Sequence, residues 1–273
     1  MTSSIRDLVL LRAVSLFPAI AILALGAGCG GDAATRVPSH EFYAEDPFAF
    51  DVTAEGRTSF RLEGINGTVD VAGGASGKGI SVSGIRRVEA ESVEEAEARL
   101  VDLEVDVSSE GAQVLVRTRE PQDTAGRGYI VNYTVTLPAN LRVVVVNVNG
   151  NITIDSMEND VDVQAGNGQV ILESIAGSAL VAVTNGTVIA DVEIPLGGRI
   201  VVETINGTVD LSIPVDTSAL FEATVVNGTI GLSGLALSAR QETPVSLTGV
   251  LGSGDGQITL STVNGTIDVS GRP

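Results

Sequence analysis

The chain has 273 residues, of which 44% are hydrophobic but only 3% aromatic, and it has no tryptophan. A core of this composition is built from Val, Ile, Leu and Ala, which suits thin, regular layers better than a deep globular interior. The formal net charge of −18 argues against nucleic acid and anionic lipid headgroups as partners, because like charges repel.

The first 28 residues have the pattern of an export signal peptide. Two arginines provide a positive start, and residues 13–28 form a short apolar stretch that ends in small residues. Pro18 and Gly26 interrupt this stretch, which is also too short for a comfortable membrane span. We therefore expect residues 1–28 to be a signal peptide that is removed on export.

The only cysteine, Cys29, directly follows that segment. The run LGAGC (residues 25–29) resembles a bacterial lipobox, in which the cysteine takes a diacylglycerol and the chain is cut just before it. A Leu is usual three residues before the cysteine, whereas here Gly26 holds that place and Leu25 lies one residue further back. We expect lipidation of Cys29 and a lasting membrane anchor. The alternative is an ordinary secretory signal with an incidental cysteine.

Residues 29–46 are polar, broken by Pro38, and without an apolar period, which predicts a flexible tether. His40, the only histidine, lies in this tether without partners for a metal or catalytic role. Removal of residues 1–28 takes away two Arg and one Asp, so 14 basic and 33 acidic side chains remain, a net charge of −19.

Residues 47–140 are predicted to be a β-rich part with one helix. The period of the apolar residues changes from two to that of a helix between about Ser92 and Leu103, and Ser92 with Glu95 matches a capping box. Glu95 and Arg99 are spaced for an i,i+4 ion pair. We expect the apolar stripe of this helix to cover an end or side of the β-core. Strands are predicted to resume at 113–119 and 129–137.

Residues 141–273 are predicted to form a regular array, because an Asn-Gly pair recurs with spacings near twenty residues. A first pair precedes the array. The seven pairs are Asn66-Gly67, Asn149-Gly150, Asn167-Gly168, Asn185-Gly186, Asn206-Gly207, Asn227-Gly228 and Asn264-Gly265. The last spacing, 37, is close to two ordinary steps.

The same positions around every pair are apolar. The third residue after each Asn is always β-branched, the fifth after it is always apolar, and so is the fourth before it. This alternation places one face inside and the other in solvent. Asn and Gly suit a corner because both tolerate positive φ. Seven pairs in one register favour an all-β, parallel β-solenoid with ladders of identical residues; the alternative is an antiparallel meander or sandwich with hairpin turns.

The chain resembles the bacterial putative-adhesin domain of unknown function over roughly residues 55–270. The resemblance rests on the order of four segments: SVEEAEARLVDLEVDV, QVLVRTR, YTVTLPANLRVVVVNVNGNITI and the repeated TxNGT(V/I) coils. It implies a β-solenoid at the cell surface, suspected of adhesion or of a part in envelope stress responses. The family has no established catalytic residues, so none can be transferred.

The favoured function is a non-enzymatic, lipid-anchored envelope protein that presents a solenoid surface for adhesion or scaffolding. Its partners would be the membrane, through the anchor, and an unknown protein or surface glycan, with no cofactor or metal. Gly30 after Cys29 is compatible with delivery to the outer membrane if the host has one, as resemblance to other lipoproteins implies. A regulatory envelope-stress protein that docks on a membrane signalling partner is the alternative.

A polysaccharide-active enzyme is less favoured, since it needs two carboxylates at a defined separation or a metal cluster beside a base. Asp70, Asp210 and Asp268 share one repeat position, but Asp210 and Asp268 are expected to lie several coil spacings apart, too far to cooperate. A calcium-stabilised array is disfavoured as well, because carboxylates in the repeat are sparse.

Overall fold

The computed structural model describes residues 42–74 and 79–273. Cys29, His40 and the predicted signal peptide lie outside the described residues. Within these residues the chain forms 19 strands of one hydrogen-bonded sheet, one α-helix and one 3-10 helix. The predicted all-β, mainly parallel solenoid is confirmed, and the antiparallel alternative is wrong for the central coils. Strand β1 already begins at Phe42, so its first five residues, 42–46, belong to the segment predicted as the tether.

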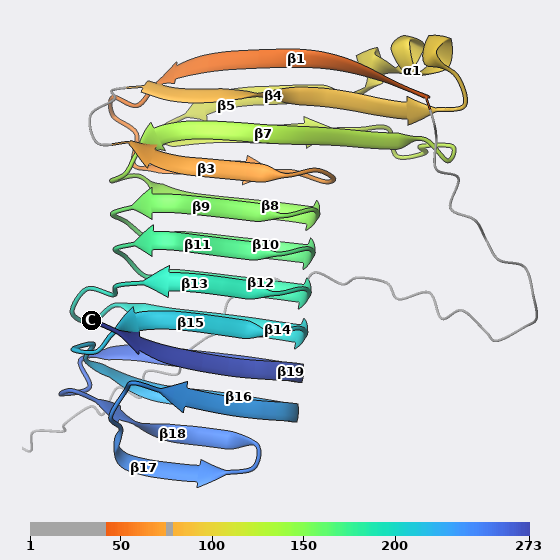
Figure 1. Cartoon of the computed structure of the whole chain (residues 1–273). Coiled ribbons are helices and arrows are strands. Elements are labelled where there is room, and N and C mark those ends of the chain that lie inside the picture. The colour runs from red at the N-terminus through yellow and green to blue at the C-terminus, as the bar shows by residue number, and fades with distance from the viewer. Residues whose placement is uncertain (1–41, 75–78) are drawn as a thin grey trace, which may run out of the picture. The chain divides into compact units, whose positions relative to one another are not determined.

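Each central coil consists of one strand that leads into an Asn-Gly pair and one that follows it. The leading strands pair in parallel with each other and form the first ladder: β8 (Arg142–Asn149), β10 (Val161–Asn167), β12 (Ala179–Asn185) and β14 (Arg199–Asn206). The following strands form the second ladder: β9 (Ile152–Met157), β11 (Val170–Ile175), β13 (Val188–Val192) and β15 (Val209–Pro214). Figure 1 shows these coils one above another.

The register of both ladders follows the repeat, because equivalent residues of neighbouring coils are Cα partners. Val145, Val163 and Val181 are aligned in the first ladder, as are Ile152 and Val170 in the second. A shift by one residue would turn every buried side chain outward, so the apolar pattern fixes this register.

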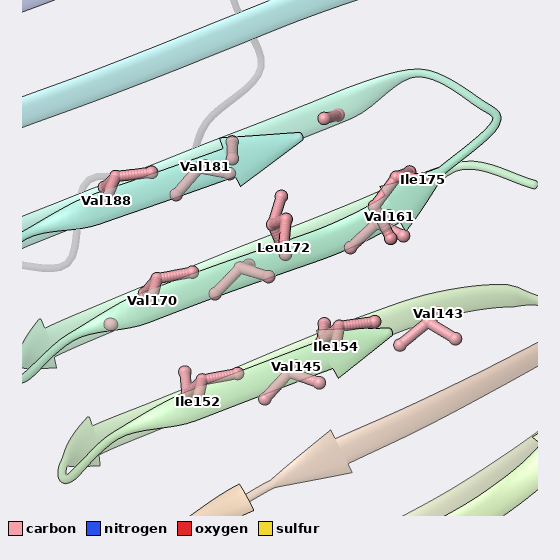
Figure 2. Packing of buried hydrophobic residues seen from close by; sticks show 14 of the residues in the cluster. Val143, Val145, Ile152, Ile154, Val161, Val170, Leu172, Ile175, Val181 and Val188 are labelled. Atoms are coloured by element: carbon pink, nitrogen blue, oxygen red, sulfur yellow. The ribbon is translucent and has the colours of Figure 1, made fainter. Parts of the chain in front are cut away.

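The core lies between the two ladders. In Figure 2 aliphatic side chains from both strands of three coils point into a shared interior, and the labelled residues are at most 3% exposed. The branched side chains fit a narrow, layered interior in which each coil buries its apolar face against the next. At the last coil, Ile230 and Leu232 occupy the same repeat positions but are only partly buried.

The coils do not stack in the order in which they occur along the chain. The N-terminal part contains β1 (Phe42–Thr53), β2 (Ser59–Glu63), β3 (Val69–Gly74), β4 (Gly79–Ala90), β5 (Glu104–Glu110), β6 (Gln113–Arg119) and β7 (Gly128–Pro138). The β2–β3 coil lies between β6–β7 on one side and β8–β9 on the other, with β4 and β1 continuing the second ladder antiparallel beyond β7.

A second reordering occurs at the C-terminal end. It involves β16 (Ala219–Ser233), β17 (Ser238–Thr243), β18 (Ser246–Leu251) and β19 (Gly256–Arg272). The last strand, β19, lies between the β14–β15 coil and β16. The long spacing before Asn264 is therefore not a missing coil: it holds the antiparallel β17–β18 hairpin, which extends the first ladder beyond β16.

The predicted helix is confirmed, with α1 at Val93–Arg99 followed by the 3-10 helix η1 at Leu100–Asp102. The Ser92 hydroxyl accepts a hydrogen bond from the Glu95 amide at 3.2 Å, as the capping box predicts. The predicted Glu95–Arg99 pair is not a direct ion pair: Glu95 receives a hydrogen bond from Arg127 at 2.7 Å, and Arg99 adds an electrostatic attraction that lowers the pKa of Glu95. The helix covers the ends of β1 and β4, where Ala44, Ala90 and Ala96 form a small buried cluster.

Candidate interaction surface

The seven predicted corner asparagines form one continuous ladder of side-chain amides. Six of the seven Nδ2 atoms donate to the Oδ1 of the asparagine in the neighbouring coil, over 2.7–2.9 Å. Along the stack their order is Asn66, Asn149, Asn167, Asn185, Asn206, Asn264 and Asn227. The ladder satisfies polar groups at a corner where the backbone turns, and its six links hold successive coils in one register.

The ladder has one polarity. At the N-terminal end, Asn66 Nδ2 donates to the main-chain carbonyl of Tyr129 at 3.1 Å. A carbonyl oxygen only accepts, so it requires the amino group of Asn66 to face it. Every further amide must then point the same way, because each Oδ1 is already facing the donor of the next coil. At the opposite end, the Oδ1 of Asn227 has no donor among the described residues.

The glycine after each asparagine is required mainly by close approach between coils. A Cβ on Gly186 would overlap the carbonyl oxygen of Gly168, and a Cβ on Gly150 would overlap that of Gly67. The expected positive φ is found at Gly150 (126°), but none of the seven asparagines adopts it. The asparagine is therefore selected for its amide, and only the glycine for its backbone.

The outer face of the first ladder is aliphatic. The outward positions of β8, β10, β12 and β14 form two rows across the strands, given by their registers. The rows are Val144, Asp162, Leu180, Val201 and Val146, Gln164, Ala182, Glu203. Five of these eight side chains are aliphatic, and most of the rows are half-buried by one another. We name these eight residues the aliphatic face.

The outer face of the second ladder is acidic instead. Its outward positions on β9, β11, β13 and β15 are Thr153, Asp155, Ile171, Glu173, Ile189, Asp191, Asp210 and Ser212. Among the described residues, only one acidic side chain of this group is in an ion pair, namely Asp191, which contacts Arg272 at 2.5 Å. We name these eight residues the acidic face. The two outer faces thus differ in chemistry although they share one repeat.

The predicted separation of Asp210 and Asp268 is wrong. Because β19 is inserted next to β15, the two residues are direct Cα partners on neighbouring strands. Asp268 lies on its other side against Gly231, where a Cβ would overlap its carboxylate oxygen. The missing side chain lets Asp268 lean away from Asp210, which relieves repulsion between two exposed carboxylates. Asp70, the third residue of the set, lies far along the ladder between Thr134 and Thr153.

Other polar clusters of the described residues are explained by local structure. The Ser218 hydroxyl accepts from the backbone amides of Ser253, Gly254 and Asp255 at 3.0–3.2 Å and donates to the Asp255 carboxylate at 2.8 Å, thereby bracing the β18–β19 loop. Hydrogen bonds from Ser253 and Ser218 lower the pKa of Asp255. Described residues contain no group of three or more His, Cys, Asp or Glu that could hold a metal ion.

A shallow hollow of about 320 Å³ lies on the outer surface of β16, β18 and β19. Leu220, Val250, Gln257 and Thr259 line it, and Glu222 is its single carboxylate. A lone carboxylate does not supply the paired acid and base that glycoside hydrolysis uses.

The aliphatic face was missed when only the Asn-Gly repeat was considered. Its sequence signal is the continuous apolar runs VVVV at 143–146 and ALVAV at 179–183, which leave no polar residue for an outward position. Such runs indicate strands with apolar side chains on both faces. A strict alternation, as in Val209-Asp210-Leu211, indicates a solvated outer face.

Comparison with known proteins agrees with this architecture. Residues 141–270 match the sequence model of the Toastrack DUF4097 family. The resemblance to a putative-adhesin domain of unknown function is thereby confirmed over these residues. No curated protein sequence matches significantly.

Two solved structures illustrate the similarity. A putative cell adhesion protein from Clostridium sporogenes aligns with 10% identity over 84% of this chain and 100% of its own, with a TM-score of 0.48. A putative adhesin from Bacteroides fragilis aligns with 10% identity over 82% of this chain and 97% of its own, with a TM-score of 0.30. Among the described residues, no helix is both long and apolar enough to span a bilayer.

Proposed function

We propose that the protein is a non-enzymatic envelope protein, lipid-anchored through Cys29, that binds a protein or glycan of the cell surface through its aliphatic face. The match of residues 141–270 to the Toastrack DUF4097 family supports a non-catalytic surface role. The anchor follows from the lipobox-like run before Cys29. In this proposal the stacked coils serve as a rigid support, and the protein binds its partner without catalysing a reaction on it.

The observation that carries this proposal is the contrast between the two outer faces. Surface sheets normally place polar side chains outward, as the acidic face does. Aliphatic side chains gathered on an outer face, here Leu180, Ala182 and Val201 on the neighbouring strands β12 and β14, mark interaction sites instead. The aliphatic face also has only two charges, Asp162 and Glu203, in a chain of net charge −18, so a partner can approach there with little repulsion.

The test is a charge introduced on each face in turn. Leu180→Arg places a cation at the centre of the aliphatic face, and Ile189→Arg is the matched control on the acidic face, where Ile189 is 38% exposed. We expect retention of the purified protein on envelope material to fall for Leu180→Arg and to persist for Ile189→Arg. Equal retention of both variants and the unchanged chain would contradict binding through the aliphatic face.

The identity of the retained material separates adhesion from regulation. Retention by surface glycan or whole cells supports adhesion, whereas recovery of one membrane signalling protein supports the regulatory alternative. Turnover of a cell-wall polymer by the purified protein would contradict the non-enzymatic proposal.

The anchor is tested independently with a labelled fatty acid. We expect label in the unchanged chain and none in Cys29→Ala, with the variant released from the membrane fraction. Label that persists in Cys29→Ala would exclude this cysteine as the attachment point.

A further inference from the structure

We propose that Asn227-Gly228, at the open end of the asparagine ladder, is a site of spontaneous deamidation, and that the fold protects the other six Asn-Gly pairs from this reaction. The sequence offers seven chemically equivalent sites, since Gly presents an unhindered backbone nitrogen after each asparagine. The structure makes one of them different.

The reaction needs two groups of the same dipeptide and water. The backbone nitrogen of Gly228 attacks Asn227 Cγ and forms an N–Cγ bond, while the Cγ–Nδ2 bond breaks. The side-chain nitrogen leaves as ammonia and takes with it the proton lost by the Gly228 amide. Water then opens the succinimide ring at either carbonyl and gives aspartate or isoaspartate. The net change is uptake of one water and loss of one ammonia, with no redox step.

In the protected pairs both reacting groups are held by hydrogen bonds. The backbone amide after Asn66 donates to the carbonyl of the asparagine in the next coil, with N···O 2.9 Å, and the same bond of 2.9–3.0 Å recurs at four more coils. The five donors are Gly67, Gly150, Gly168, Gly186 and Gly207. Gly265 lies in β19, which has strand neighbours on both sides. Attack would first require these bonds to open, which lowers the population of the reactive geometry.

Asn227 belongs to the last coil on the side to which all five amides point. Strand β18 pairs with β16 only as far as Thr224, and the following amide of Val225 donates to Val245. From Asn227 onward, the only described strand that pairs with β16 is β19. The Gly228 amide, which alternates toward the open side, therefore has no acceptor in any described strand.

Two further observations single out this pair. Gly228 is exposed, whereas the other six glycines of the Asn-Gly pairs are only partly exposed. Asn227 also makes only one ladder bond, its donation to Asn264 Oδ1 at 2.9 Å, and its own Oδ1 accepts from none of the described residues. Nucleophile and electrophile are thus both less constrained than in any other coil.

The product changes the chemistry of a free sheet edge. The other free edges carry charges: Glu45 and Asp51 on β1, Asp106 on β5, and Arg240 with Glu242 on β17. Residues 227–233 of β16 carry none. Deamidation adds one negative charge to this edge, and charge on an edge strand opposes pairing with another chain.

The experiment follows all seven pairs in one sample. The purified full-length protein is incubated folded at mildly alkaline pH, and in parallel unfolded in urea, and then digested with a protease that cleaves after Glu. The glutamates at 63, 89, 158, 173, 193, 203, 222 and 242 place each Asn-Gly pair in a different peptide. Mass spectrometry then measures the conversion of amide to carboxylate at each pair.

We expect the Asn227 peptide of the folded protein to convert on the order of tenfold faster than any other, a factor that corresponds to about 1.4 kcal/mol. In urea all seven should convert at similar rates. Asn227→Gln, which keeps the amide but closes a larger ring, should abolish this conversion and leave the others unchanged. Equal rates in the folded protein, or faster conversion at an interior pair such as Asn185, would overturn the proposal.

Discussion

Each ladder asparagine except Asn227 acts as donor and acceptor at once, so its carboxamide cannot be replaced by an isosteric carboxylate. An aspartate accepts on both oxygens and donates nothing when ionised. In the middle of the ladder it would face the Oδ1 of one neighbour with another acceptor and lose that bond. The asparagine is consequently specified by the stack of coils and not by the corner that it occupies.

We therefore predict that Asn185→Asp lowers the free energy of unfolding by about 1–3 kcal/mol, the usual cost of an unsatisfied polar group. Asn185 donates to Asn167 and accepts from Asn206, both at 2.8 Å. Asn140→Asp is the control, since it adds the same charge at an exposed residue outside the ladder. Urea unfolding of both variants measures the difference. If Asn185→Asp lowers the free energy of unfolding no more than Asn140→Asp does, the ladder contributes little to stability.

A second residue-scale prediction concerns Tyr133, which is 1% exposed and bonds to the Thr118 hydroxyl at 2.6 Å. Burial raises the pKa of Tyr133 to about 12, although the bond to Thr118 lowers it slightly. The neutral phenol is favoured in the folded state, so its contribution to stability is complete below a pH of about 10 and is lost as pH rises through about 12.

Tyr133→Phe should therefore flatten the fall in stability between pH 10 and about 12. At neutral pH the same variant should cost about 1–3 kcal/mol, because the buried Thr118 hydroxyl loses its partner. Tyr43→Phe is the control, as the Tyr43 side chain is 47% exposed. Thermal unfolding across this pH range gives the answer. If stability falls equally between pH 10 and about 12 in Tyr133→Phe and in the unchanged chain, groups other than Tyr133 cause that fall.

At the scale of elements, α1 is short and depends on its cap. It spans seven residues, and such a helix is not stable alone in water. The Ser92 cap and the packing of Ala96 against Ala44 and Ala90 therefore hold it at the ends of β1 and β4. The Arg127–Glu95 pair adds a link to the β6–β7 loop, and this hydrogen bond lowers the pKa of Glu95.

Ser92→Ala should destabilise the protein by about 1 kcal/mol, the typical cost of a lost N-cap. Hydrogen exchange should become faster in residues 93–99 and remain unchanged in the central coils, because the helix contacts mainly β1 and β4. Ser109→Ala on the edge strand β5 is the matched control. Uniformly faster exchange over all coils would show that the helix supports the whole stack.

How far the sequence predicts these elements depends on the range of the interactions that form them. The alternation around each Asn-Gly pair and the capping box at Ser92 are local, and they predict the coils and the helix correctly. The stacking order is not local: nothing near Asn264 indicates that its coil inserts beside Asn206. The wrong separation of Asp210 and Asp268 and the unpredicted bond from Arg127 to Glu95 have this same cause, since both depend on distant chain segments.

At the scale of the molecule, this stacking order makes the C-terminal end of the array depend on β19, which connects β16 to the central coils. In a stack built in chain order, removal of the last coil would leave the rest intact, because repeats contact only their neighbours. Here the last strand along the chain lies inside the stack. Strand β19 pairs with β14 and β15 on one side and with β16 on the other, and Thr262 bonds to Thr204 within the core at 2.7 Å.

Deletion of residues 256–273 should therefore do more than shorten the stack. Strand β16 and the β17–β18 hairpin would lose their connection to β14 and β15, and the aliphatic side chains of Ile200 and Val202 would lose their partners Ile258 and Leu260. We expect limited proteolysis to cut the truncated protein between residues 215 and 255, with residues 141–206 still protected. Removal of residues 272–273 alone is the control. Protection of residues 215–255 in the truncated protein would show that β16 can dock directly on β14 and β15. Strand β19 would then not be needed to hold β16 and the β17–β18 hairpin on the stack.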